Sequence, residues 1–124
     1  MNYLGKDSIK ACDKLCSVYR INCNDCAKCY VGQSSRVLSV RIKEHQRDCK
    51  NKKETSAVYS HVKESGHSFD FNNVKILDQE PLYFKRLISE MVFITKLDSV
   101  NTILDTSNLS NIFKYYINNH MTYR

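Results

Sequence analysis

Four residues have the types and spacing of a metal site. Cys23 and Cys26 form a C-x2-C pair in a polar turn, and His61 and His67 form an H-x5-H pair at the end of a predicted helix. Two thiolates and two imidazoles make a tetrahedral set suited to Zn²⁺, although the 34 residues between the halves exceed the spacing of a classical zinc finger. Such a site would fasten the turn to the helix.

Other interpretations of these residues stay open. Cys29 is a rival ligand, because Cys26 and Cys29 are also separated by two residues, although strand alternation places Cys29 away from the turn. The alternative is that the four residues are free thiols and surface histidines. The remaining cysteines are expected to be small buried apolar side chains: Cys12, Cys16 and Cys49.

A second set combines two phenols, a cation, an imidazole and an acid: Tyr19, Tyr30, Arg41, His45 and Glu90. Phosphodiester hydrolysis needs a group that orients or deprotonates water, a cation facing the charge on the phosphate, and a divalent metal held by an oxygen ligand. Each residue also has an ordinary alternative. The tyrosines could be strand aromatics, Arg41 a surface charge, and Glu90 an ion-pair partner of Arg86.

Two predicted strands and a helix position the first of these residues. Residues 16–21 and 29–33 are rich in aromatic and β-branched side chains, and the polar residues between them favour a turn. The side chains that follow recur at the spacing of one helix face: Leu38, Ile42, His45 and Cys49. Either Ser34 or Ser35 is predicted to cap this helix.

Three further elements complete the predicted fold. A short helix over residues 56–65 is capped by Thr55 or Ser56 and stopped by Gly66. Residues 74–78 form a third predicted strand, and Pro81 opens a helix over residues 82–97. We therefore expect an α/β (α+β) fold, with a small three-stranded antiparallel sheet flanked by helices. A terminal helix could use four later apolar residues: Leu109, Ile112, Phe113 and Tyr116.

The helix over residues 82–97 is predicted to be the central and most buried one, because only a narrow stripe of it is polar. At 100° per residue, Glu90 falls among Tyr83, Leu87, Ile94 and Leu97 rather than in that stripe. A carboxylate in such a place needs a partner.

Composition favours one folded domain with an affinity for polyanions. The 124 residues are 42% hydrophobic, enough for one core and not for two. Nineteen basic against thirteen acidic residues give a net charge of +6, of which +5 falls between Arg36 and Lys53. That segment is either a solvated helix face or a phosphate-binding surface.

The sequence also bears on location. Residues 1–10 lack the apolar centre of a signal peptide, and no apolar run is long enough to span a bilayer. We expect an intracellular protein without membrane contact. In a reducing compartment, metal binding explains close cysteine pairs better than disulfides do.

Taken together, these motifs resemble the GIY-YIG nuclease superfamily. The resemblance rests on "SVY" at 17–19, "YVG" at 30–32, "RIKEH" at 41–45 and Glu90, and covers nearly all of residues 16–101. Three longer segments are similar to the endonuclease domain of Penelope-like retroelements: "VYRINCNDCAKCYVGQSSRVLSVRIKEH", "SHVKESGHSFDFNNVKIL" and "EPLYFKRLISE". That subgroup carries a two-cysteine, two-histidine zinc motif within the nuclease fold. Ser17 departs from the usual glycine of the first signature.

The resemblance implies a role for each residue of the second set. Tyr19 would act as or orient the general base for the attacking water, and Tyr30 would line the same cleft. Arg41 would stabilise the pentacovalent phosphate, assisted by His45. Glu90 would hold a single Mg²⁺ or Mn²⁺.

Two further positions follow from the same resemblance. Gly32 would keep the backbone close to the cleft, where a side chain would obstruct it. Asn101 would lie near the metal or the phosphate. Four basic residues would hold the DNA backbone without reading sequence: Arg36, Lys43, Arg47 and Lys50.

The implied reaction is nicking of DNA, leaving 3′-hydroxyl and 5′-phosphate ends, and nuclear residence follows from that substrate. A reverse transcriptase, to which the Penelope-group nuclease is fused, is an implied partner in cis or in trans. The expected organisation is an N-terminal extension (1–15), an endonuclease-like domain (16–105) and a C-terminal tail (106–124). The alternatives are a catalytically inactive, zinc-stabilised DNA-binding relic or adaptor, and a zinc-stabilised protein-interaction module.

Overall fold

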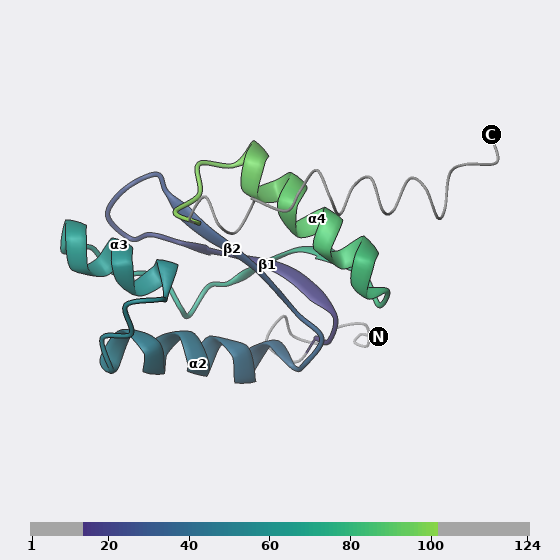
Figure 1. Ribbon diagram of the computed structural model, residues 1–124, viewed down its shortest axis with the longest axis horizontal. Coiled ribbons are helices and arrows are strands. Elements are labelled where there is room, and N and C mark those ends of the chain that lie inside the picture. The colour runs from purple at the N-terminus through teal and green to yellow at the C-terminus, as the bar shows by residue number, and fades with distance from the viewer. Residues whose placement is uncertain (1–13, 102–124) are drawn as a thin grey trace, which may run out of the picture.

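The computed structural model describes residues 14–101, which form a three-stranded antiparallel sheet with helices on both sides (Figure 1). The central strand β1 (Ser17–Asn22) pairs with β2 (Cys29–Ser34) and with β3 (Lys75–Gln79). Helices α2 (Leu38–Lys50) and α3 (Ala57–Ser65) follow β2, and α4 (Tyr83–Lys96) follows β3. The predicted small α/β fold, with a three-stranded antiparallel sheet flanked by helices, is confirmed. Cys12, most of the predicted N-terminal extension and the whole predicted tail lie outside the described residues.

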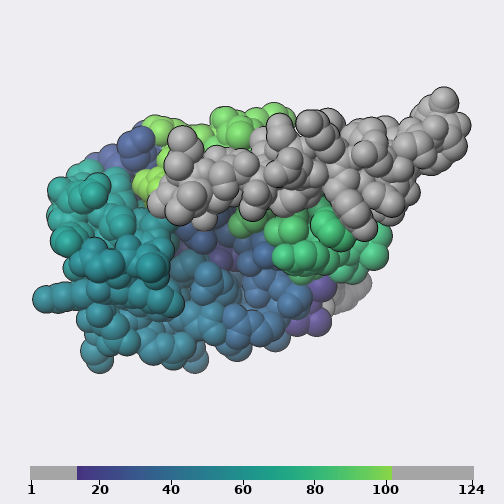
Figure 2. Space-filling view, viewed as in Figure 1, coloured from purple at the N-terminus to yellow at the C-terminus, as the bar shows by residue number. Residues whose placement is uncertain are grey.

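Alternation along β1 separates two hydrophobic clusters. Tyr19 and Ile21 pack with Leu38 and Ile42 of α2 on one face. Val18 packs on the other face, in a cluster completed by β2 and α4 residues: Cys29, Val31 and Ile94. Figure 2 shows the sheet set back between the layer of α2 and α3 and the layer of α4. Because of this alternation, Tyr19 is directed towards α2.

The ends of α3 confirm the predicted signals. The hydroxyl of Ser56, the N-cap, accepts a hydrogen bond from the backbone N–H of Tyr59 at 3.1 Å. Gly66 ends the helix in the left-handed conformation at φ +76°. Local sequence therefore determines where α3 begins and ends.

The predicted cap of α2 is wrong. Val37 is the N-cap and makes no side-chain hydrogen bond to the helix. Ser34 is instead the last residue of β2, paired with Ser17, and its hydroxyl accepts a hydrogen bond from the backbone N–H of Arg36 at 3.1 Å. Strand pairing therefore prevents Ser34 from reaching the helix.

The prediction that α4 is the most buried helix is also wrong. Tyr83 is 55% exposed, and Phe84 and Val92 are nearly 40% exposed, whereas Met91 and Ile94 are buried. Within the described part of the chain, α4 packs against one face of a three-stranded sheet, which is too narrow to cover so wide an apolar surface. The helix also begins later than expected, because Leu82 rather than Pro81 precedes its first turn.

No helix between residues 14 and 101 is both long enough and apolar enough to cross a membrane.

Candidate active site and metal centre

The folded chain brings together four of the six predicted catalytic residues, where β1 and β2 meet α2: Tyr19, Tyr30, Arg41 and His45. The hydroxyl of Tyr19 lies 2.7 Å from Nε2 of His45. The ring of Tyr30 packs edge-on against that of His45, with 4.9 Å between centroids. Arg41 lies one turn before His45 on α2 and lines the same cavity as Tyr30 and His45. Two adjacent strands and one helix thus position these groups.

The side chains of Tyr19 and Tyr30 leave no room for a side chain at Gly32. It lies opposite Tyr19 in the β1–β2 ladder. A Cβ atom on Gly32 would stand 2.6 Å from Cζ of Tyr19 and 2.9 Å from Cε2 of Tyr30, closer than packed carbon atoms approach one another. The space that a side chain would fill is therefore occupied by the Tyr19 phenol.

Burial keeps both partners of the Tyr19–His45 hydrogen bond uncharged at neutral pH. Burial raises the pKa of Tyr19 well above its usual range, and Tyr30 and the charge of Glu90 act in the same direction, whereas Arg41 opposes them. Burial and then the charge of Arg41 lower the pKa of His45 to about 3. A neutral imidazole can accept the phenol proton at Nε2 when its own proton is on Nδ1.

One carboxylate holds two arginines beside this site. Arg36 donates two hydrogen bonds to Glu44, at 2.7 and 2.8 Å, and Arg41 donates a third at 3.1 Å. Arg36, followed by Arg41, lowers the pKa of Glu44 to about 2. Glu44 thereby orients the guanidinium of Arg41, and the predicted DNA contact Arg36 is an ion-pair partner in this structure.

Glu90 is half-buried on α4 and does not line the cavity formed by Tyr30, Arg41 and His45. Its charge nevertheless acts on the Tyr19 phenol, whose pKa it raises. The carboxylate is therefore within electrostatic reach of Tyr19.

Asn101 clamps the free edge of β2. Its side-chain oxygen accepts from the N–H of Val31 at 3.0 Å, and its amide nitrogen donates to the carbonyl of Val31 at 2.8 Å. The preceding residues pair with the same edge, because Cys29 donates to the carbonyl of Asp98 and Val100 donates to that of Cys29. Both ends of the Asn101 amide are thus engaged by backbone rather than directed into the cavity.

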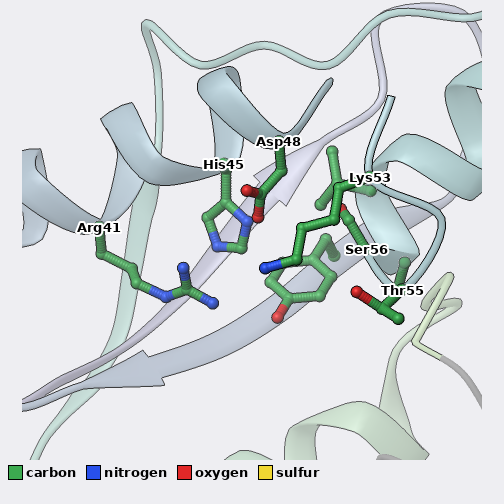
Figure 3. A pocket seen from close by; sticks show the side chains of 9 residues that line it. Arg41, His45, Asp48, Lys53, Thr55 and Ser56 are labelled. Carbon is green, nitrogen blue, oxygen red and sulfur yellow. The ribbon is translucent and has the colours of Figure 1, made fainter. Parts of the chain in front are cut away.

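The cavity has a volume of about 240 Å³ and continues from the candidate catalytic residues towards α3. Figure 3 shows Arg41, His45 and Asp48 on the α2 side, facing Lys53 and Thr55 on the other. Asp48, Lys53 and Thr55 were not predicted to be residues of the active site. Asp48 could have been found from its position one turn after His45. Lys53 and Thr55 belong to a loop that shows no periodic signal.

Three of the predicted DNA-binding residues face away from this cavity. Lys43, Arg47 and Lys50 are exposed and recur at i, i+4 and i+7 along α2. At 3.6 residues per turn, their mean direction is about 160° from that of Arg41, His45 and Asp48. A DNA phosphate in the cavity would therefore not contact this outer face.

The predicted metal ligands form a cluster in which all four ligand atoms lie within 4.8 Å of one another: Cys23, Cys26, His61 and His67. The sulfur of Cys23 is 3.5 Å from Nδ1 of His67, the sulfur of Cys26 is 3.6 Å from Nε2 of His61, and the two nitrogens are 3.3 Å apart. In a tetrahedron around Zn²⁺, the S···N edge is about 3.6 Å and the N···N edge about 3.3 Å. The cluster could therefore bind a metal such as zinc.

Backbone pairing brings the two halves of the cluster together. Asn24 donates to the carbonyl of Ser68 at 2.8 Å, and Asp25 accepts from the N–H of Ser68 at 3.0 Å. Cys23 forms an isolated antiparallel bridge with Phe69. The segment after α3 is thus bonded to the hairpin turn, which places His67 beside Cys23.

Cys29, the rival ligand, is outside this cluster. It is fully buried with Val18, Val31 and Ile94 on the α4 face of the sheet. Cys16 and Cys49 are partly buried free thiols. The Cys23–Cys26 pair, rather than Cys26–Cys29, would therefore supply the sulfur ligands of a metal ion bound at this cluster.

Comparison of the chain with protein-family models, with curated proteins and with solved structures finds no match.

Proposed function

We propose that this protein is a metal-dependent DNA endonuclease of the GIY-YIG type that hydrolyses a phosphodiester bond and nicks one strand. The observation that carries the proposal is the 2.7 Å contact between the Tyr19 hydroxyl and the neutral, buried His45, beside the guanidinium of Arg41. A phenol bonded to a neutral base and flanked by a fixed cation suits attack by water on a phosphate.

The geometry supports a proton relay. The oxygen of Tyr19 takes a proton from the attacking water while the phenol passes its own proton to Nε2 of His45. The bond to the 3′ oxygen breaks as the water oxygen bonds to phosphorus, and the departing 3′ oxygen takes a proton from solvent. Burial is the main cause of the low pKa of His45, and a phosphate bound at Arg41 would offset the second cause, which is the positive charge of Arg41.

Arg41 faces the charge that develops on the phosphate, and Glu44 holds it in place. Glu90 is the candidate ligand for one Mg²⁺ or Mn²⁺, which would act as a Lewis acid on the leaving oxygen. Its charge already acts on Tyr19, which supports a place next to the reaction centre.

The Cys2His2 cluster would hold a structural Zn²⁺. All four positions are supplied by protein side chains, as in closed structural sites, so no position remains for water or substrate. The ion would join the β1–β2 turn to α3, which forms one wall of the cavity. DNA is the proposed partner, and nuclear residence and a reverse transcriptase acting in cis or in trans remain proposals that depend on it.

Plasmid nicking tests the proposal. Supercoiled DNA is incubated with the zinc-loaded protein in Mg²⁺ or Mn²⁺, alongside Arg41→Lys and Glu90→Gln, with Tyr83→Phe on the exposed side of α4 as the control. We expect the wild type and Tyr83→Phe to produce open circles, and the other two variants to be at least 100-fold slower. Equal nicking by all four proteins, or none by the wild type in either metal, would reject the proposal.

A second candidate function is binding of DNA without cleavage. One observation favours it: Glu90, the proposed ligand of the catalytic metal, does not line the cavity. The same assay separates the two functions when plasmid retention on a gel is measured next to nicking. Retention of DNA without open circles would identify the non-cleaving module.

A further inference from the structure

The cavity next to the candidate catalytic residues is larger than the reaction requires. Its volume of about 240 Å³ exceeds the space that a single phosphate group needs. Its near wall consists of Tyr30, Arg41 and His45, and its far wall extends to Lys53, Thr55 and the first turn of α3. A ligand that reaches Arg41 thus has room to continue towards Lys53.

The far wall is suited to an anion. Lys53 belongs to no ion pair among residues 14–101, whereas Arg36, Arg41, Lys28 and Lys63 are all paired with carboxylates there. Figure 3 shows its ammonium group directed into the cavity towards Arg41. The first turn of α3 adds backbone N–H groups that have no partner within the helix. The outer face of α2 cannot take this role, because Lys43, Arg47 and Lys50 face away.

Asp48 limits what the cavity can hold. Its carboxylate lines the same space but makes no ion pair with Lys53. A second phosphate beside Asp48 would be repelled, whereas a donor group of a base would be accepted there. The arrangement therefore fits a nucleotide, with its phosphate at Lys53 and a hydrogen-bond donor towards Asp48, better than it fits a bare phosphate.

We propose that this cavity binds the nucleotide next to the scissile phosphate, and that Lys53 contacts the phosphate of that nucleotide. The inference deepens the proposed endonuclease function and depends on it, because only cleavage defines which phosphate lies next to the bound nucleotide. The binding itself can be measured without cleavage.

The test is a titration of the full-length, ¹⁵N-labelled, zinc-loaded protein with a 5′-phosphorylated thymidine dinucleotide in Ca²⁺, followed by amide chemical shifts. We expect saturable shifts at Lys53, Thr55, Ala57 and Val58, and much smaller shifts with thymidine, which lacks phosphate. Lys53→Ala should weaken binding about tenfold, and Lys53→Glu more, because one charged contact to phosphate is lost or reversed.

Lys85→Ala is the matched control, since Lys85 is exposed on α4, on the other face of the sheet, and loses the same charge. It should bind the dinucleotide within twofold of the wild type. Shifts confined to the outer face of α2, or equal affinities for the wild type and Lys53→Glu, would overturn the inference. If either of these results is found and the wild type still nicks plasmid, the nucleotide site is rejected and the endonuclease function is retained. If the dinucleotide shifts Lys53 but the wild type does not nick plasmid, the nucleotide site is retained and the endonuclease function is rejected.

Discussion

The hydroxyl of Tyr19 and Nε2 of His45, 26 residues apart in the chain, lie 2.7 Å apart across the interface between β1 and α2. Both side chains are almost completely buried. The bond satisfies two polar atoms in the core, and in the proposed reaction it would align a phenol with a base.

Replacing Tyr19 with phenylalanine should separate these two contributions. The variant keeps the ring but leaves Nε2 of His45 buried without its partner, so we expect a loss of about 1–3 kcal/mol in the free energy of unfolding. Nicking should fall by about 100-fold or more, because the water-orienting hydroxyl is gone. Urea unfolding and initial nicking rates measure the two effects. Undiminished nicking would exclude Tyr19 from the reaction.

The low pKa of His45 predicts a pH-dependent contribution to stability. Its pKa is about 3 in the folded protein and about 6.5 in an unfolded chain. Between these values the unfolded state binds more protons, so the contribution is complete above pH 6.5 and is lost as the pH falls towards 3, with a slope of up to about 1.4 kcal/mol per pH unit.

His45→Gln removes this titration. We therefore expect the difference in unfolding free energy between the wild type and His45→Gln to shrink as the pH falls from 6.5 to 4.5, measured by urea unfolding at each pH. The candidate metal ligands titrate in both proteins and cancel in the difference. A gap that stays constant across this range would show that His45 is not buried as a neutral ring.

Gly32→Ala should disturb the site through packing alone. The new methyl group would overlap the Tyr19 ring, and overpacking of this kind costs about 1–3 kcal/mol. Nicking should fall as the phenol is displaced. Gly66→Ala is the control, because a Cβ at this position would meet no atom within 4 Å. Its only expected cost is about 1 kcal/mol in the free energy of unfolding, from the positive φ of residue 66. If both variants nick equally well per folded molecule, Gly32 is not needed to place Tyr19.

Metal content tests the Cys2His2 cluster. Purified protein should contain about one equivalent of zinc, and Cys26→Ser close to none, whereas Cys16→Ser should keep the ion because Cys16 is outside the cluster. At free zinc about 100 times the dissociation constant, binding adds about 2.7 kcal/mol to the stability of the folded state. A chelator should lower the melting temperature of the wild type and of Cys16→Ser but not that of Cys26→Ser. A zinc-free wild type that melts at the same temperature with and without chelator would reject the site.

Asn101→Ala should remove two hydrogen bonds from the edge strand β2. The N–H and carbonyl of the buried Val31 lose both side-chain partners, so we expect a loss of about 1–3 kcal/mol and faster hydrogen exchange at the Val31 amide. Asn72→Ala, at an exposed turn, should change stability by less than about 0.5 kcal/mol. Unchanged exchange at Val31 in Asn101→Ala would show that the clamp is not formed.

Features set by neighbouring residues could be predicted from the sequence. Ser56 and Gly66 mark the ends of α3 because a side-chain oxygen and a left-handed backbone satisfy groups within a single turn. The spacing of Leu38 and Ile42 predicts the buried face of α2 for a similar reason, since the helical repeat alone places them there. The predicted helix cap at Ser34 is wrong because Ser34 pairs with Ser17 in the sheet, a contact that the local sequence does not indicate.

The tertiary structure decided which distant groups meet. Cys23 lies beside His67 because the segment after α3 pairs with the hairpin turn, and Lys53 faces Arg41 because α3 packs next to α2. Packing of α2 against β1 turns Lys43, Arg47 and Lys50 away from the cavity, and the narrow sheet leaves Tyr83 of α4 exposed. Residue types and local periods specify the side chains available for chemistry, whereas contacts across dozens of residues depend on how whole elements pack, which no short-range pattern encodes.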